Sequence, residues 1–141
     1  MIPESVQAMN REIEVHGLHD HITYLGPRHD AQAIMRNCDI GILSSITEGL
    51  PVSLLEYGMA QLPVVTTPAG QSAEVIGQGQ AGLLVPSGSP QSMAVALDRL
   101  LSDPALRQRL GQAFYLRVNS VYGPEPVIER LMRIYDTVLR S

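Results

Sequence analysis

The chain contains no lysine and no tryptophan, and it has one cysteine and one phenylalanine in 141 residues. All ten basic residues are arginines and the formal net charge is −4, which argues against the basic surface of a nucleic-acid-binding protein. Because Cys38 is alone, it forms no internal disulfide, and we expect a reducing, cytoplasmic location. No apolar run approaches the length that spans a membrane. The composition, 45% hydrophobic and 17% charged, is typical of one folded globular domain.

Short apolar segments alternate with amphipathic ones along the chain. This alternation predicts an α/β fold with a Rossmann-like, doubly wound parallel sheet flanked by helices, followed by a helical C-terminus. Ligands of such sheets bind beyond the carboxyl ends of the strands. The predicted strands are 21–25, 39–43, 62–66 and 81–85, and the predicted helices are 3–16, 30–37, 51–61, 71–77, two that start at Ser89-Pro90 and Asp103-Pro104, and about 125–139. We expect the last helix to bury Val127, Ile128, Leu131, Ile134, Tyr135 and Val138.

The most informative segment runs from Ser44 to Glu56 and has two carboxylates on either side of a Gly/Pro turn. Pro51 suits the first turn of a helix, because its fixed φ is helical and its missing N–H costs nothing there. Glu48 therefore lies in the loop, and Glu56 lies about one and a half turns inside the helix. Gly49 lets the backbone approach a ligand or adopt positive φ. The free N–H groups at the helix start favour phosphate, and the carboxylates can accept hydrogen bonds from sugar hydroxyls.

Spacing alone also allows a purely structural interpretation of the two carboxylates. In that case Glu48 interacts with the positive end of the helix dipole, and Glu56 is a solvated or paired surface residue. Six arginines in residues 105–141 indicate a solvated helix face, with peripheral contact to anionic lipid as the alternative. Four histidines between His16 and His29 lack the spacing of a metal site, and we interpret them as ordinary surface residues.

The run Glu48-Gly49-Leu50-Pro51-Val52-Ser53-Leu54-Leu55-Glu56, followed by Leu62-Pro63-Val64-Val65-Thr66-Thr67, resembles a known family. It is similar to the donor-binding, C-terminal half of retaining nucleotide-sugar glycosyltransferases with the GT-B fold, the glycosyl transferases group 1 with their E-x(7)-E motif. The likeness covers nearly all of residues 18–120. It implies that residues 1–141 are the nucleotide-sugar (donor) binding domain of a two-domain enzyme.

The resemblance also implies a role for each residue of the motif. Glu48 would be the catalytic residue, holding hydroxyls of the donor sugar, and Glu56 would accept hydrogen bonds from the ribose. The donor would be a UDP- or GDP-sugar, and a glycan or lipid-linked acceptor would receive the sugar with retention at the anomeric carbon. No cofactor and no metal are expected, because the helix dipole and cationic side chains neutralise the diphosphate. The implied donor-binding residues are Glu48, Gly49, Leu50, Pro51, Val52 and Glu56.

The chain departs from the family pattern in two ways. Tyr57 and Gly58 follow the second glutamate in place of the usual small residue, and Gln61 stands where glycine is common. The family's donor half also begins with a strand, a Gly-Arg turn and a Lys-Gly pair, none of which this chain contains. We therefore expect a piece of a longer enzyme that lacks the first strands of this domain and the acceptor domain, and that is inactive alone.

Two other functions stay open from the sequence. One is a non-catalytic module of the same fold, which binds nucleotide weakly or acts as a scaffold; the missing cationic segment favours it. The other is a nucleotide-sugar epimerase of similar architecture, which the run from Glu48 to Glu56 fits less well.

Overall fold

The structure, a computed structural model, describes residues 4–140 and divides into two compact units, with the boundary in the sequence between Asp30 and Ala31. The first unit contains α1 (Glu4–Val15). This helix ends as expected at Gly17, which has φ of +64° and lets the N–H of Leu18 bond to the carbonyl of Ile13 at 2.9 Å. The predicted start of this helix at Pro3 lies outside the described residues.

The predicted strand 21–25 is wrong. Residues 22–25 have an irregular backbone and their side chains are exposed. An extended segment becomes a strand only when a neighbouring strand takes up its backbone hydrogen bonds. Within residues 4–140, no strand pairs with this segment.

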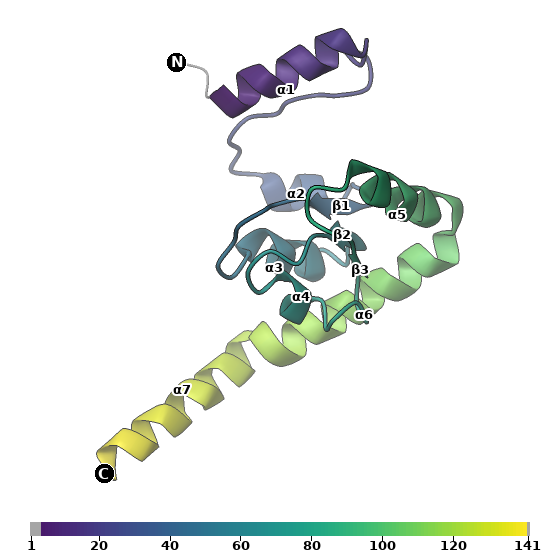
Figure 1. The fold of residues 1–141 in the computed structure, drawn as a ribbon. Coiled ribbons are helices and arrows are strands. Elements are labelled where there is room, and N and C mark those ends of the chain that lie inside the picture. The colour runs from purple at the N-terminus through teal and green to yellow at the C-terminus, as the bar shows by residue number, and fades with distance from the viewer. Residues whose placement is uncertain (1–3, 141) are drawn as a thin grey trace. The chain divides into compact units, whose positions relative to one another are not determined.

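The second unit is built on a parallel sheet, as the alternating pattern predicts. Its strands in the described residues are β1 (Gly41–Leu43), β2 (Val64–Thr66) and β3 (Leu83–Leu84), in the order β1-β2-β3 (Figure 1). Gly41 lies opposite Val64 and Val65 lies opposite Leu83. Each strand begins about two residues later than its apolar segment. The carboxyl ends of all three strands therefore point to one rim of the sheet.

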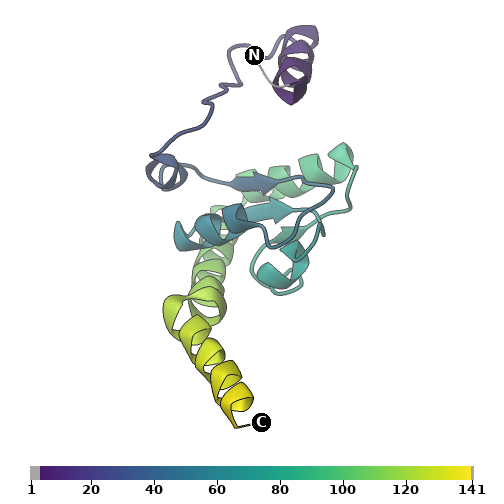
Figure 2. The same ribbon diagram turned by 90° about the vertical axis from the view of Figure 1, so that its left-hand side faces the viewer.

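Helices cover both faces of this sheet. The helices of this unit are α2 (Ala31–Met35), α3 (Val52–Met59), α4 (Ser72–Val75), α5 (Pro90–Ser102), α6 (Pro104–Tyr122) and α7 (Pro124–Leu139). Figure 1 shows α3 and α5 on opposite sides of the strands, and in Figure 2 α3 lies in front of the sheet. The long helix α6 contacts both α3 and α5. It contributes to the hydrophobic core on each face.

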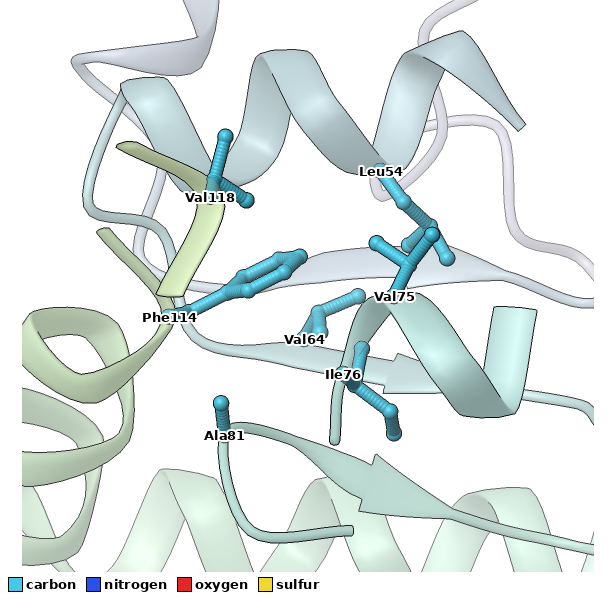
Figure 3. Packing of buried hydrophobic residues seen from close by; sticks show 7 residues of the cluster. All are labelled: Leu54, Val64, Val75, Ile76, Ala81, Phe114 and Val118. Carbon is cyan, nitrogen blue, oxygen red and sulfur yellow. The ribbon is translucent and has the colours of Figure 1, made fainter. Parts of the chain in front are cut away.

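The core on the α3 face is gathered around one aromatic ring, which is fully buried (Figure 3). Phe114 and Val118 of α6 pack there with Leu54 of α3 and with Val64 of β2, and the remaining members are Val75, Ile76 and Ala81. Gly58 is required at this contact, because a methyl group in its place would overlap the side chain of Val118. On the other face, Val65 packs with Leu100, Leu106 and Leu110.

The predicted helix starts after residue 88 are confirmed. The Ser89 side chain accepts a hydrogen bond from the N–H of Ser92 at 3.3 Å, and the Asp103 side chain accepts one from Leu106 at 2.9 Å. In each case proline follows the capping residue.

Two of the arginines in residues 105–141 donate hydrogen bonds to the last carbonyl groups of other helices. Arg107 donates to the carbonyls of Leu100 and Leu101 at the end of α5, and Arg117 donates to those of Glu74 and Val75 at the end of α4. A cation at the negative end of a helix dipole is stabilising. These two side chains therefore have a structural role and are not part of a purely solvated face.

The predicted burial of the last helix is wrong. Of the residues described in α7, none is buried. An amphipathic helix buries its apolar stripe only where another element packs on it. All six residues that the sequence predicts to be buried are exposed, namely Val127, Ile128, Leu131, Ile134, Tyr135 and Val138. Among residues 4–140, no helix combines the length and the apolar character needed to cross a membrane.

Candidate functional site

Two loops at the carboxyl rim of the sheet form the candidate site. One follows β1 and leads to α3 through Glu48, and the other follows β2 and leads to α4 through Gly70. Parallel strands bring the loops that follow them to the same edge. The structure confirms that these two loops are in contact, because the N–H of Gln71 donates to the carbonyl of Gly49 at 3.0 Å.

Glu48 lies in the β1–α3 loop, as the sequence predicts, and its side chain is half-buried. The hydroxyl of Ser45 donates a hydrogen bond of 2.7 Å to its Oε1. A carboxylate has about four lone-pair positions on its two oxygens. The contact with Ser45 therefore leaves Glu48 with acceptor capacity for a ligand.

The β2–α4 loop supports the loop that carries Glu48. The Thr67 hydroxyl donates to the carbonyl of Ser45 at 2.5 Å, and the Thr67 N–H donates to the carbonyl of Leu43 at 3.1 Å. Thr67 is 3% exposed, so both bonds are shielded from water. These two hydrogen bonds therefore fix the backbone of the loop that carries Glu48.

Gly70 is a site residue that reading the motif alone misses. Its φ is +51°, and a methyl group there would overlap the carbonyl oxygens of Glu48 and Gly49. By contrast, Gly49 does not have positive φ, and a methyl group added to it meets nothing within 4 Å. Of the two roles that the sequence allows for Gly49, positive φ is therefore excluded, and close approach of a ligand stays a prediction. The glycine that this site requires stands on the neighbouring loop, and its signal in the sequence was the turn Thr67-Pro68-Ala69-Gly70.

The start of α3 is open to solvent. Gly49, Leu50 and Val52 are exposed, whereas the Pro51 side chain is buried. Pro51 stands one position before the first helical residue, with φ of −75° and ψ of 99°, and it gives α3 no side-chain cap. Within the described residues, the N–H of Leu54 donates to the carbonyl of Pro51 at 3.1 Å, which leaves the N–H groups of Val52 and Ser53 at the start of α3 for a ligand. They are the donors that the motif predicts for a diphosphate.

Glu56 lies in α3, as predicted, and its surroundings differ from those of Glu48. It is half-buried and lines a hollow of about 170 Å³ between α2 and α3. Arg36 and Gln32 of α2 line the same hollow. This places one acidic, one basic and one amide side chain around a small concave surface beside the helix that starts at the candidate site.

Tyr57, next to Glu56, is held between α3 and the edge strand β1. Its hydroxyl donates to the carbonyl of Ile42 at 3.3 Å, and its ring lies against Gly41. Burial raises the pKa of Tyr57 above its ordinary value, and the negative charges of Cys38 and Glu56 raise it further. The large residue after the second glutamate therefore takes up space that Gly41 leaves open.

A second hollow, of about 460 Å³, opens at the same rim on the α5 side of the sheet. Ser44 of the first loop and Thr67 of the second line it together with apolar side chains of α5, Met93 and Leu97. The sequence predicts ligand binding beyond the carboxyl ends of the strands, but it does not predict this apolar wall. Among the described residues there is no cluster of three or more histidine, cysteine or acidic side chains arranged to bind a metal ion.

Residues 3–117 match the family model of glycosyl transferases group 1. A relative from Mycobacterium leprae, described as a phosphatidyl-myo-inositol mannosyltransferase, is 35% identical over 128 residues. That match covers 89% of this chain and 34% of the relative. The chain therefore spans about a third of the length of this relative.

Solved structures show the same fold. The C-terminal domain of a glycosyl transferase group 1 family protein from Francisella tularensis is 27% identical and superposes with a TM-score of 0.75, over 86% of this chain and 64% of that one. The Anabaena protein HepE, in complex with UDP, is 22% identical with a TM-score of 0.81, over 91% of this chain and 36% of that one. The parallel sheet with flanking helices is thus the C-terminal domain fold of these proteins.

Proposed function

Because the chain belongs to the glycosyl transferases group 1 family, we propose that it is the donor-binding part of a retaining hexosyltransferase. Its substrate is a UDP- or GDP-sugar, and the complete enzyme passes the sugar to a glycan or a lipid-linked acceptor. The Anabaena neighbour is in complex with UDP, and the mycobacterial relative is described as acting on a lipid, phosphatidyl-myo-inositol. Both support these two substrate classes.

One observation carries the proposal: an anchored carboxylate stands beside an uncapped helix start. Ser45 holds Glu48 at 2.7 Å, and the first residues of α3 are exposed without a side-chain cap. A diphosphate fits the N–H groups at that helix start, because they are hydrogen-bond donors at the positive end of a dipole. A hexose linked to the diphosphate then lies within reach of the Glu48 loop.

Each residue of the motif has a distinct role in this proposal. Glu48 accepts hydrogen bonds from the sugar hydroxyls and stabilises positive charge that develops near the anomeric carbon. It acts by position and charge, and no covalent intermediate forms on it. The N–H groups around Gly49, Leu50 and Val52 face the sugar and the diphosphate. Glu56 accepts hydrogen bonds from the ribose hydroxyls of the nucleotide.

The chain supplies only one side of the reaction centre. Transfer requires an acceptor held on the opposite side of the donor and water kept out of the closed site. Because the chain spans about a third of the mycobacterial relative, we assign acceptor binding to a part of the enzyme outside these residues. On this proposal the isolated chain binds donor and does not turn it over.

Titration of the chain with UDP, GDP and ADP, followed by amide shifts in an NMR spectrum, tests the proposal. We expect shifts concentrated in residues 48–56 for UDP or GDP, with affinity of about millimolar order because cationic phosphate ligands are few. ADP is the matched control for a diphosphate with another base. Uniformly unchanged spectra with all three nucleotides would contradict donor binding.

A non-catalytic module of the same fold is the second candidate. The absence of lysine and of a Gly-Arg pair favours it, since the family grips the phosphates with such cations. The coding sequence upstream of Met1 distinguishes the two functions. A preceding Rossmann-like half with Gly-Arg and Lys-Gly elements supports the enzyme, and an authentic start at Met1 supports the module.

A further inference from the structure

The Glu48 carboxylate is held by a side chain outside the E-x(7)-E motif. The Ser45 hydroxyl, three residues earlier in the same loop, donates to Oε1 of Glu48 at 2.7 Å. Both side chains are half-buried, so water competes less for this bond than it would on an open surface. A hydrogen bond to a charged acceptor is stronger than one between neutral groups.

Ser45 is itself fixed by a second element. The carbonyl of Ser45 accepts the hydrogen bond of the buried Thr67 hydroxyl, and Thr67 also bonds through its N–H to Leu43 at the end of β1. Thr67 is therefore bonded to the end of β1, Ser45 is bonded to Thr67, and Glu48 is bonded to Ser45. Each step joins groups within hydrogen-bonding distance, so the orientation of the carboxylate is tied to the end of the sheet.

From this chain of contacts we infer that Ser45 is a positioning residue for Glu48, and that Thr67 fixes Ser45 in turn. The inference rests on the proposed function. Ser45 occupies one side of the carboxylate and leaves Oε2 to accept a hydroxyl of the donor sugar. The carboxylate is oriented before the sugar arrives, which lowers the entropy lost on binding. The contribution is specific to the sugar, because Ser45 acts only through Glu48.

A double-mutant cycle on the chain separates this role from general stabilisation of the loop. Binding of UDP-glucose and of UDP is measured for wild type, Ser45→Ala, Glu48→Ala and the double variant. We expect Ser45→Ala to weaken UDP-glucose binding about tenfold and to leave UDP binding within about twofold. We expect the double variant to bind UDP-glucose like Glu48→Ala alone, because Ser45 has nothing left to orient.

Two further variants control for the chemistry of the hydroxyl. Ser45→Thr keeps the donor and should retain most of the UDP-glucose affinity. Thr47→Ala removes an exposed hydroxyl from the same loop and should bind both ligands like wild type. If Ser45→Ala does not fold, Thr67→Val takes its place in the cycle with the same expected pattern.

The outcomes distinguish the inference from the function on which it rests. Wild type that binds neither ligand at residues 48–56 overturns the proposed function and the inference together. Wild type that binds UDP-glucose, with Glu48→Ala weakened and Ser45→Ala unchanged, overturns the inference alone. Equal losses of UDP and UDP-glucose in Ser45→Ala also overturn it, since they indicate a purely structural role.

Discussion

The N–H of Gln71 donates a 3.0 Å hydrogen bond to the carbonyl oxygen of Gly49, joining the loop after β2 to the loop that carries Glu48. The two loops can come this close because Gly70, one residue before Gln71, has no side chain that would overlap the carbonyl oxygens of Glu48 and Gly49. The candidate site is therefore a property of two loops that are about twenty residues apart along the chain.

Gly70→Ala should destabilise the chain much more than Gly49→Ala. Gly70 has φ of +51°, where a non-glycine residue costs about 1–2 kcal/mol, and its methyl group would also displace two carbonyls. Gly49 has ordinary φ and open space around it, so its replacement should change the free energy of unfolding by less than about 0.5 kcal/mol. Urea unfolding of both variants measures the difference. Equal midpoints would show that the two loops do not depend on this contact.

Replacement of the two glutamates should separate chemistry from nucleotide binding. In the complete enzyme, we expect Glu48→Ala to reduce transfer about a hundredfold or more, because a preorganised charge near the reacting carbon is lost. Glu56→Ala should weaken nucleotide binding about tenfold, because the ribose hydroxyls lose an ionised acceptor. Transfer assays and UDP titrations of both variants provide the measurement.

The decisive comparison is which of the two alanine variants, Glu48→Ala or Glu56→Ala, loses more affinity for UDP. Glu48→Ala should lose less affinity for UDP than Glu56→Ala does, because Glu48 faces the sugar. Glu48→Gln and Glu56→Gln retain the size of each side chain and control for packing. Transfer by both alanine variants at the wild-type rate would contradict the assignment of the site.

Gln61→Gly should stabilise the chain. Gln61 has φ of +57°, a left-handed conformation that glycine adopts without strain, and it stands where the family commonly has glycine. We expect a gain of about 0.5–1 kcal/mol in the free energy of unfolding. Gln78→Gly, at φ of +56°, should change stability in the same direction. Gln112→Gly, in the exposed interior of α6, should instead cost about 1 kcal/mol.

Much of the fold could be predicted from the sequence because helix caps and apolar segments act on the residues next to them. The Ser89-Pro90 and Asp103-Pro104 pairs cap their helices where they stand, and the apolar segments that end at Leu43 and Thr66 contain strands of the parallel sheet. The placement of Glu48 in a loop and of Glu56 in a helix followed from Pro51 in the same way.

Features that depend on a distant partner could not be predicted from pattern. In the part of the chain that the structure describes, residues 21–25 have a strand-like pattern but no strand pairs with them, and no surface buries the apolar stripe of α7. The Thr67–Ser45 hydrogen bond and the close approach at Gly70 belong to the same class, since each joins residues of two different loops. Sequence periodicity reports what a segment can bury, whereas tertiary structure decides what covers it.

Alkaline pH should destabilise the chain partly through Tyr57 and Tyr122. Burial raises the pKa of both phenols above the ordinary value of about 10, with the charges of Cys38 and Glu56 adding to the effect at Tyr57 and that of Glu74 at Tyr122. In the unfolded chain both ionise at lower pH than in the folded one. Stability that is fully present below about pH 10 is therefore lost as pH rises through the folded-state values.

Phenylalanine variants measure these two contributions separately. Tyr57→Phe and Tyr122→Phe should each make the fall in stability above about pH 10 shallower, as followed by urea unfolding at fixed pH. At neutral pH the two should differ. Tyr57→Phe loses a hydrogen bond to the carbonyl of Ile42, whereas the buried Tyr122 hydroxyl has no hydrogen-bond partner within residues 4–140. Tyr122→Phe should therefore preserve or raise neutral stability, and a loss of more than about 1 kcal/mol would show that this hydroxyl has a partner after all.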